Sequence, residues 1–343
     1  MAFRVLASLS ILAEDQSCLH LLWWLNWAVS KSHSERHKRY DKGSQGQWLL
    51  IRRVVIGQAG QIWCRFGMFF HPQLVTKIVS KPLNILVLIG SPRNEESWTY
   101  KSIRILEGKI CELVSANFEY IFVEKLKLPF CDGCLHCVTV GEHDCPEYSI
   151  IGPIAAKMDR ADGLILGSPI HTFNITGLMK NFVEFFMYKR NRPSFFGKKA
   201  LVTATASGGG HKVVMDFLEQ TANAWGCDVV GRMGISSSQM LKPKYLKLVD
   251  EIASELAATF VAAIQQGELG SPKFRHLMNF RAMQNMTRNQ PNSVNHRYWE
   301  ERNWLDAEYY TSVPISLYAR LMAGYIAGKM RSSMRKGNQK PYR

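Results

Sequence analysis

The stretch from Leu83 to Thr99 reads Leu-Asn-Ile-Leu-Val-Leu-Ile-Gly-Ser-Pro-Arg-Asn-Glu-Glu-Ser-Trp-Thr. Its first half is an apolar run of strand length, rich in branched residues, which predicts a strand buried on both faces of a parallel sheet. Gly90 and Pro92 end this run, and from Ser97 onward the apolar residues follow a helical spacing. A strand, a polar loop and a helix in this order direct loop amides and a helix N-terminus toward an anion.

The loop also carries side chains that suit a phosphate. Arg93 adds a cation that can form a forked contact with phosphate oxygens, and Ser91, Ser97 and Thr99 add hydroxyl donors. The sequence here contains neither Gly-x-Gly-x-x-Gly nor Gly-Lys-Ser/Thr, so a dinucleotide fingerprint and a nucleoside-triphosphate loop do not fit. Two interpretations remain open: a phosphate-binding loop and an ordinary strand-to-helix turn.

Strand and helix patterns alternate along the following 170 or so residues. Strands are predicted over Phe118–Val123, Gly163–Leu166, Lys199–Thr205 and Asp228–Met233. Helices are predicted over Ile150–Met158, Leu178–Tyr188, Val213–Trp225 and Tyr245–Ile264. This alternation predicts an α/β fold with a doubly wound, five-stranded parallel sheet in the flavodoxin-like order 2-1-3-4-5. A ligand of such a sheet binds at the carboxyl ends of the strands, where the loop after the first strand lies.

The net charge of +15 is not carried by this predicted domain. Residues 84–266 contain 19 basic and 19 acidic residues, whereas residues 1–83 contain 11 and 4 and residues 267–343 contain 13 and 5. A nucleic-acid reader carries its basic face on the folded domain, so no nucleic-acid partner is expected. Basic flanks are typical of solvated tails or of weak attraction to acidic surfaces such as membranes.

We therefore divide the chain into three parts. Residues 1–82 show no regular pattern and are predicted to be an extension that is disordered or not part of the fold. Residues 83–266 form the flavodoxin-like domain, and residues 267–343 form a helical, basic C-terminal tail. The apolar run Ile315–Met330 in this tail has two interpretations: a helix that docks on a partner subunit, and an interfacial helix that makes weak contact with a membrane surface.

Two later blocks of sequence reinforce the first loop. One block runs from Ala161 to Phe182 and contains Gly-Ser-Pro-Ile-His-Thr-Phe-Asn, and the other is Thr-Ala-Ser-Gly-Gly-Gly-His from Thr205 to His211. The three blocks, in this order, resemble the NAD(P)H-dependent FMN reductases of the flavodoxin-like fold over about residues 83 to 235. The resemblance implies bound FMN, NAD(P)H as co-substrate, a homodimer and a cytoplasmic location. The FMN-binding residues that it implies are Ser91, Arg93, Ser97, Trp98, Thr99, Pro169, Ile170, His171, Phe173, Asn174, Ser207, Gly208 and Gly209.

Four of the eight cysteines lie within fifteen residues. They are Cys131, Cys134, Cys137 and Cys145, spaced as Cys-x-x-Cys-x-x-Cys-x7-Cys-Pro. Two-residue gaps let thiolates converge on one ion or cluster. The spacing resembles that of the iron–sulfur flavoprotein branch of the same family, which implies that the four cysteines hold a [4Fe–4S] cluster. A zinc ion with four thiolates and a vestigial motif without metal are alternatives, and disulfides are not expected without a secretion signal.

These patterns together predict an FMN-dependent NAD(P)H oxidoreductase. Electrons would pass from nicotinamide through flavin to the cluster and on to an acceptor such as a quinone or a redox protein. Alternatives are a cluster-free NAD(P)H:FMN or quinone reductase, a flavin electron carrier without nicotinamide activity, and a sensor or scaffold that has lost its cofactor. No catalytic side chain is assigned, because the flavin carries the hydride chemistry and the protein orients it.

Overall fold

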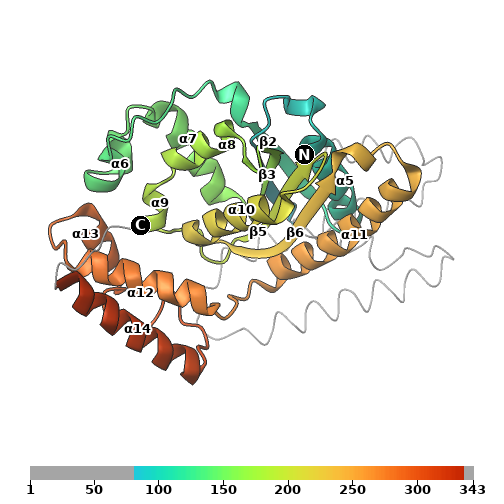
Figure 1. The fold of residues 1–343 in the computed structure, drawn as a ribbon. Helices are drawn as coiled ribbons and strands as arrows, with labels where there is room; N and C mark the ends of the chain where they lie inside the picture. The colour runs from blue at the N-terminus through green and yellow to red at the C-terminus, as the bar shows by residue number, and fades with distance from the viewer. Residues whose placement is uncertain (1–80, 336–343) are drawn as a thin grey trace, which may run out of the picture. The chain divides into compact units, whose positions relative to one another are not determined.

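A computed structural model describes residues 81–335, with residues 330, 331 and 333–335 described by their backbone alone (Figure 1). The predicted extension over residues 1–82 therefore lies outside the described residues except for its last two positions. Among the described residues, no helix combines the length and the hydrophobicity that crossing a bilayer requires.

The centre of the fold is a parallel sheet. Its strands are β1 (Leu83–Ile89), β2 (Ala116–Phe122), β3 (Gly163–His171), β5 (Lys199–Ala206) and β6 (Asp228–Ser236), and they lie in the order β2-β1-β3-β5-β6. Counted along the chain, these five strands have the predicted order 2-1-3-4-5, so the flavodoxin-like topology is confirmed.

One small strand was not predicted. β4 (Asn174–Ile175) pairs antiparallel with the end of β3, with His171 opposite Asn174. The two residues between them, Thr172 and Phe173, have φ angles of +49° and +60°. Positive φ at both central residues is the signature of a tight type I′ hairpin. Sequence reasoning ended the strand at Leu166, because Gly167 and Pro169 look like breakers when the hairpin partner is unknown.

Two helical layers cover the sheet (Figure 1). Alternate residues of β1 enter opposite layers: Ile85 and Val87 pack in one cluster, and Leu86 and Leu88 pack in the other. This division explains why the strand is apolar at every position from Ile85 to Ile89. The first layer contains α5 (Trp98–Leu113) and α11 (Pro243–Gln266), and the second contains α7 (Tyr148–Arg160), α8 (Gly177–Phe185) and α10 (His211–Trp225).

The predicted helix Leu178–Tyr188 is divided in the structure. α8 ends at Phe185, and a separate short helix, α9 (Tyr188–Asn191), follows. The break occurs at Phe186, whose ψ of 17° departs from the helical range. The remaining short elements are η2 (Asn94–Glu96), η3 (Val123–Leu126), α6 (His136–Thr139), η4 (Glu142–Asp144) and η5 (Ser237–Gln239).

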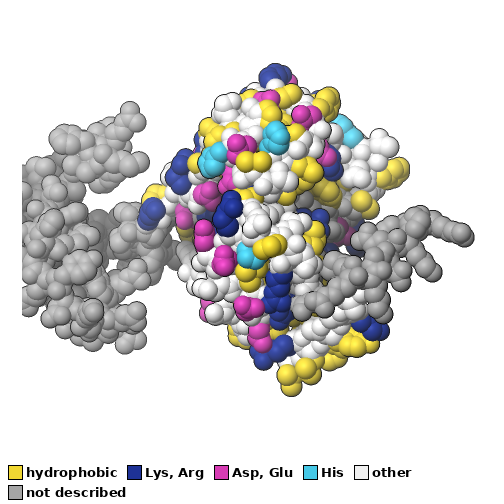
Figure 2. All heavy atoms as spheres, turned by 90° about the vertical axis from the view of Figure 1, so that its left-hand side faces the viewer, with side chains coloured by type: hydrophobic (Ala, Val, Ile, Leu, Met, Phe, Trp, Pro, Cys, Tyr) yellow, Lys and Arg dark blue, Asp and Glu magenta, His cyan; other side chains and the backbone are white. Residues whose placement is uncertain are grey.

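The C-terminal extension, residues 267–335 of the described chain, is helical as predicted. It contains α12 (Phe274–Arg288), α13 (Val294–Glu300) and α14 (Leu317–Arg335). Its aromatic core includes Phe280, Trp299 and Trp304, which pack with Phe196 of the flavodoxin-like domain. α14 packs on α12 within the same chain, and it buries Ala323 and Ala327. Figure 2 shows one side of the molecule, on which basic and acidic side chains are intermixed.

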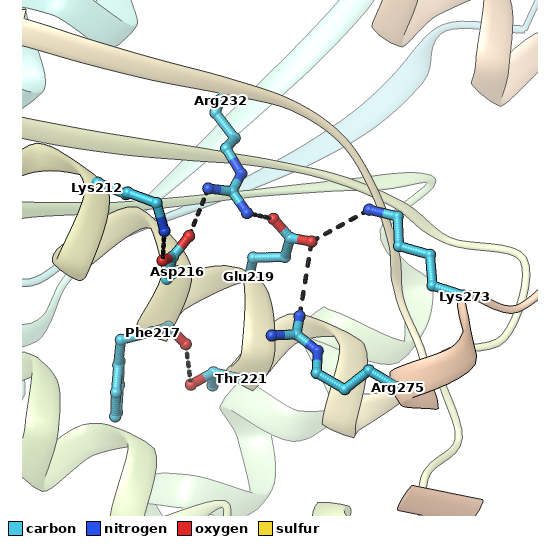
Figure 3. Close-up of polar contacts among 8 residues, drawn as sticks. All are labelled: Lys212, Asp216, Phe217, Glu219, Thr221, Arg232, Lys273 and Arg275. Carbon is cyan, nitrogen blue, oxygen red and sulfur yellow. Dashed lines mark hydrogen bonds and ion pairs between the residues drawn. The ribbon is translucent and has the colours of Figure 1, made fainter. Parts of the chain in front are cut away.

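A buried carboxylate joins the domain to the start of the extension (Figure 3). Glu219 of α10 has only 4% of its side chain exposed and accepts a hydrogen bond from Arg232 of β6. Its Oε1 atom also lies 3.4 Å from Nζ of Lys273 and 3.9 Å from Nη2 of Arg275. Three cations, one from β6 and two from the start of the extension, thus surround one carboxylate.

Candidate functional site

The loop after β1 is shaped by its own polar side chains. Ser97 is the N-cap of α5: its hydroxyl accepts a hydrogen bond from the Tyr100 amide at 3.2 Å and donates to the Asn94 carbonyl at 2.6 Å. Ser91, which is 1% exposed, accepts from the Arg93 amide at 3.2 Å. The Arg93 side chain is exposed. The loop therefore combines a helix N-terminus with an exposed guanidinium, which suits a phosphate.

Thr99 has a role that the sequence did not indicate. Its hydroxyl lies 2.7 Å from the hydroxyl of Thr205 in β5, and both residues are buried. This hydrogen bond joins α5 to the end of β5. It therefore fixes the loop after β1 relative to the glycine-rich block Thr205–His211. Trp98 is half-buried and packs with the core residues around α5.

The loop after β3 is joined to the end of β1. Thr176 is the N-cap of α8, because its hydroxyl accepts from the Met179 amide at 3.1 Å, and the same hydroxyl donates to the Gly90 carbonyl at 2.5 Å. A Cβ atom added at Gly90 would lie 2.5 Å from Cβ of Met179, so only glycine allows this approach. Sequence reasoning missed Thr176, although a Thr directly before a helical pattern is an N-cap signal.

The glycine-rich loop after β5 contacts the loop after β3. Gly210 has φ of +96°, and a Cβ added there would lie 3.2 Å from Cγ2 of Ile170 and 3.5 Å from Cα of Phe173. Open space adjoins Gly208 and Gly209, since a Cβ added at either would meet no atom within 4 Å. Side-chain-free backbone next to open space is a surface that a planar ring can approach.

The structure therefore brings the three predicted blocks to one edge of the sheet, at the carboxyl ends of β1, β3 and β5. The residues predicted to bind FMN divide by exposure. Arg93, His171, Phe173, Asn174, Ser207, Gly208 and Gly209 are exposed, Trp98, Pro169 and Ile170 are half-buried, and Ser91, Ser97 and Thr99 are buried.

The four clustered cysteines line one cavity. The cavity has a volume of about 130 Å³, and its wall also includes residues of α8 and the segment that follows it. Cys137 is buried, Cys131 and Cys145 are half-buried, and Cys134 is exposed. We call residues 131–145 the cysteine segment. The cavity has the soft thiol donors that an iron–sulfur cluster requires.

α8 holds the start of the cysteine segment. The Asn181 side chain accepts a hydrogen bond from the Cys131 amide at 2.9 Å and donates to the Pro129 carbonyl at 2.8 Å. Asn181 is 8% exposed, so both bonds are shielded from water. The helix that follows the β3 loop therefore also positions the first cysteine. Sequence reasoning missed Asn181, because the two partners are fifty residues apart.

The thiols affect one another's protonation. Burial, followed by the neighbouring Cys145, Cys131 and Cys134, raises the pKa of Cys137 to about 11. Burial also raises the pKa of Cys145. These two thiols are thus protonated at neutral pH, and a metal centre would have to displace their protons.

The arrangement differs from a site for a single ion. Within residues 81–335, no three His, Cys, Asp or Glu side chains are gathered so that they could hold one metal ion. A zinc ion with ligand distances of about 2.3 Å requires four sulfur atoms within roughly 4 Å of one another. A four-iron cluster is larger than a single ion and needs its thiolates further apart.

The fold and the loops at the carboxyl ends of β1, β3 and β5 indicate a flavin-binding oxidoreductase. Comparison with known families agrees with this class. Residues 83–240 match the family described as NADPH-dependent FMN reductase, and this part of the chain belongs to that family. The chain is accordingly an NAD(P)H-dependent flavin oxidoreductase with a flavodoxin-like domain, as the sequence predicted.

Curated relatives fall in the predicted branch. An iron–sulfur flavoprotein of Archaeoglobus fulgidus is 25% identical over 179 residues, which cover 50% of this chain and 78% of the relative. An iron–sulfur flavoprotein of Clostridioides difficile is 26% identical over 204 residues, which cover 58% of this chain and 87% of the relative. Among solved structures, an apo NADH:FMN oxidoreductase aligns at 20% identity with a TM-score of 0.41, covering 56% of this chain and 97% of that one.

Proposed function

We propose that this protein is an iron–sulfur flavoprotein that passes electrons from NAD(P)H through FMN to a [4Fe–4S] cluster held by Cys131, Cys134, Cys137 and Cys145. The terminal acceptor in this proposal is a quinone or a redox protein. The observation that carries the proposal is that all four thiols line one cavity whose wall is completed by α8 and its following segment. The curated relatives named iron–sulfur flavoproteins support the same assignment.

In this proposal the chain's own residues bind and orient the flavin. Arg93 and the amides at the start of α5 hold the phosphate, with the loop shaped by Ser91 and Ser97. Backbone of the β3 loop from Pro169 and of the glycine-rich loop at Gly208 and Gly209 faces the ring. The remaining proposed contacts are Trp98, Thr99, Ile170, His171, Phe173, Asn174 and Ser207.

The two groups supply the redox chemistry when bound. FMN would supply hydride chemistry with NAD(P)H and release of single electrons, and an iron–sulfur cluster would supply one-electron transfer. The protein contributes orientation and proximity. Asn181 links the proposed flavin site and the proposed cluster site. It lies on α8, the helix that follows the β3 loop, and its side chain accepts a hydrogen bond from the backbone amide of Cys131.

The decisive experiment is an absorption spectrum of protein purified without oxygen, with iron and acid-labile sulfide assayed on the same sample. We expect flavin bands, a broad shoulder in the 400 nm region and about four irons per chain. The variant Cys137→Ser should lose iron and sulfide but keep FMN. Cys111→Ser, which changes a cysteine of α5 outside the cysteine segment, is the matched control and should keep both.

A second candidate function is a cluster-free NAD(P)H:FMN or quinone reductase. The observation that favours it is the match of residues 83–240 to the NADPH-dependent FMN reductase family, whose description names the flavin and the nicotinamide cofactor alone. Protein that contains FMN, is bleached by NAD(P)H and contains neither iron nor sulfide would establish this function. Flavin that NAD(P)H fails to bleach would instead indicate an electron carrier without nicotinamide activity.

The proposal also includes a homodimer in the cytoplasm. α14 carries an exposed apolar stripe of Leu317, Tyr318, Leu321 and Tyr325 on the side away from α12. A partner subunit covering this stripe is our leading interpretation, and weak contact of the basic tail with a membrane surface is the alternative. Light scattering tests for the dimer, and co-sedimentation with anionic vesicles tests for membrane contact.

A further inference from the structure

A buried arginine lies between the cysteine segment and the C-terminal extension. Arg192 follows α9 and is only 3% exposed. Its Nη2 atom donates to the Cys137 carbonyl at 2.6 Å and to Oε2 of Glu142 at 2.8 Å. The guanidinium thus contacts the cysteine segment at two points, one of them the backbone of a proposed cluster ligand.

The extension completes this contact from the other side. Asn295 of α13, which is 8% exposed, accepts a hydrogen bond from Nη1 of Arg192 at 2.5 Å. Its Nδ2 atom donates to the Val138 carbonyl at 3.3 Å. Arg192 and Asn295, which are more than 100 positions apart in the sequence, therefore bind two consecutive carbonyls of the cysteine segment, those of Cys137 and Val138.

The rest of α13 fixes the position of Asn295. Trp299 donates from Nε1 to the Asn191 carbonyl at 2.7 Å, and the Tyr298 hydroxyl donates to the Pro193 carbonyl at 2.7 Å. These two carbonyls lie on either side of Arg192 in the chain. The extension therefore holds both the segment that bears Arg192 and, through Asn295, the guanidinium itself.

We propose that Arg192 and Asn295 are positioning residues through which the C-terminal extension holds the cysteine segment closed, keeping Cys137 shielded and retaining the cluster. The part about the cluster rests on the proposed function, whereas the part about Cys137 does not. Residues that orient metal ligands from outside the coordination shell affect metal retention strongly. An arginine suits this role, because its planar fork serves several acceptors at once and it stays charged when buried.

The test compares wild type with Arg192→Gln and Asn295→Ala. Arg281→Gln is the matched control, because Arg281 donates to Gln284 and to the Ala307 carbonyl within the extension and makes none of these bonds to the cysteine segment. Melting temperatures are recorded for every variant, so that general destabilisation is separated from opening of the segment. Arg192→Lys retains the charge without the fork and replaces Arg192→Gln if that variant does not fold.

Two readouts are measured. In the reconstituted protein, release of iron to a chelator should be roughly tenfold faster or more in Arg192→Gln and Asn295→Ala than in wild type. In the metal-free protein, alkylation of Cys137 by iodoacetamide, followed by mass spectrometry, should accelerate in the same two variants. Arg281→Gln should match wild type in both readouts even if its melting temperature falls.

The outcomes separate this proposal from the proposed function. Wild-type protein that takes up no iron and sulfide contradicts the cluster, but the alkylation rates still decide whether Arg192 and Asn295 hold the segment closed. Wild-type alkylation rates in folded Arg192→Gln and Asn295→Ala overturn the positioning role. Iron release at the wild-type rate in both variants overturns the part of the proposal that concerns retention of the cluster.

Discussion

The indole Nε1 of Trp299 donates a hydrogen bond to the backbone carbonyl of Asn191 across 2.7 Å, and this bond ties the C-terminal extension to the flavodoxin-like domain. Trp299 is fully buried, and its ring lies against Phe280 and Trp304. A buried aromatic ring with its polar atom satisfied contributes both apolar burial and a directed bond. The extension is consequently part of the folded structure.

Replacing Trp299 tests this coupling. Trp299→Ala should lower the free energy of unfolding by about 3–5 kcal/mol, because it leaves a large cavity and an unpaired carbonyl. Trp299→Phe should cost less, because most of the ring remains. Urea unfolding followed by circular dichroism measures both values. Met286→Ala, at an exposed position of α12, is the control and should change stability by less than about 0.5 kcal/mol. A wild-type midpoint for Trp299→Ala would contradict the packing described here.

Arg93 should recognise the phosphate of FMN and no other part of the cofactor. Arg93→Gln should weaken FMN binding roughly tenfold, which corresponds to the loss of one charge-assisted contact of about 1.4 kcal/mol. Affinity for riboflavin, which lacks the phosphate, should stay unchanged. Fluorescence quenching titrations with both ligands measure the difference. Lys101→Gln, which removes a nearby exposed cation paired with Glu96, is the control. An equal loss for both ligands would place Arg93 away from the phosphate.

Gly210 should be required for flavin binding through the shape of its loop. Gly210→Ala meets two penalties, a positive φ of +96° and a contact of 3.2 Å with Ile170. We expect a shifted β3 loop and a several-fold weaker affinity for FMN. Gly267→Ala is the matched control, since Gly267 also has positive φ, +64°, but a Cβ there meets no atom within 4 Å. It should lose stability at the end of α11 and keep its affinity for FMN. If both variants bind FMN equally, the loop contact is not important.

The parts of this structure that the sequence predicted are those fixed by local pattern. The apolar run of β1 and the alternation of strands and helices are sufficient for the sheet order, because crossover handedness and burial leave few alternatives. The Thr99–Thr205 hydrogen bond and the contacts of Arg192 with Cys137 and Asn295 join residues 55 to 106 positions apart. A single sequence contains no signal for such pairs, since each residue type is unremarkable at its position.

Glu219 should make stability depend on pH in acid. Burial by itself would raise the pKa of Glu219, but the hydrogen bond and charge of Arg232, together with the charge of Lys273, outweigh burial and hold the pKa below 4.5. A carboxyl group with a lowered pKa in the folded state stabilises the fold above its ordinary pKa, and this contribution is lost as the pH falls through 4.5 toward the folded value. Glu219→Gln removes the charge at every pH. The variant should therefore be less stable than wild type at pH 7, by about 1–2 kcal/mol, because the carboxylate is buried while its three partners are partly exposed.

The measurement is urea unfolding of both proteins at pH 7 and at several values below 4.5. The difference in unfolding free energy should shrink with decreasing pH, because protonated glutamic acid and glutamine are both neutral. Asp216→Asn removes the more exposed carboxylate that also pairs with Arg232, and it should show a smaller difference of the same sign. A difference that stays constant from pH 7 into acid would mean that Glu219 acts through packing and that the charges of Arg232, Lys273 and Arg275 do not join the extension to the domain. Glu219→Gln could instead lose stability in such a way that α12 unfolds separately from the flavodoxin-like domain. That result would show that Glu219, together with Trp299, makes the domain and the extension unfold as one unit.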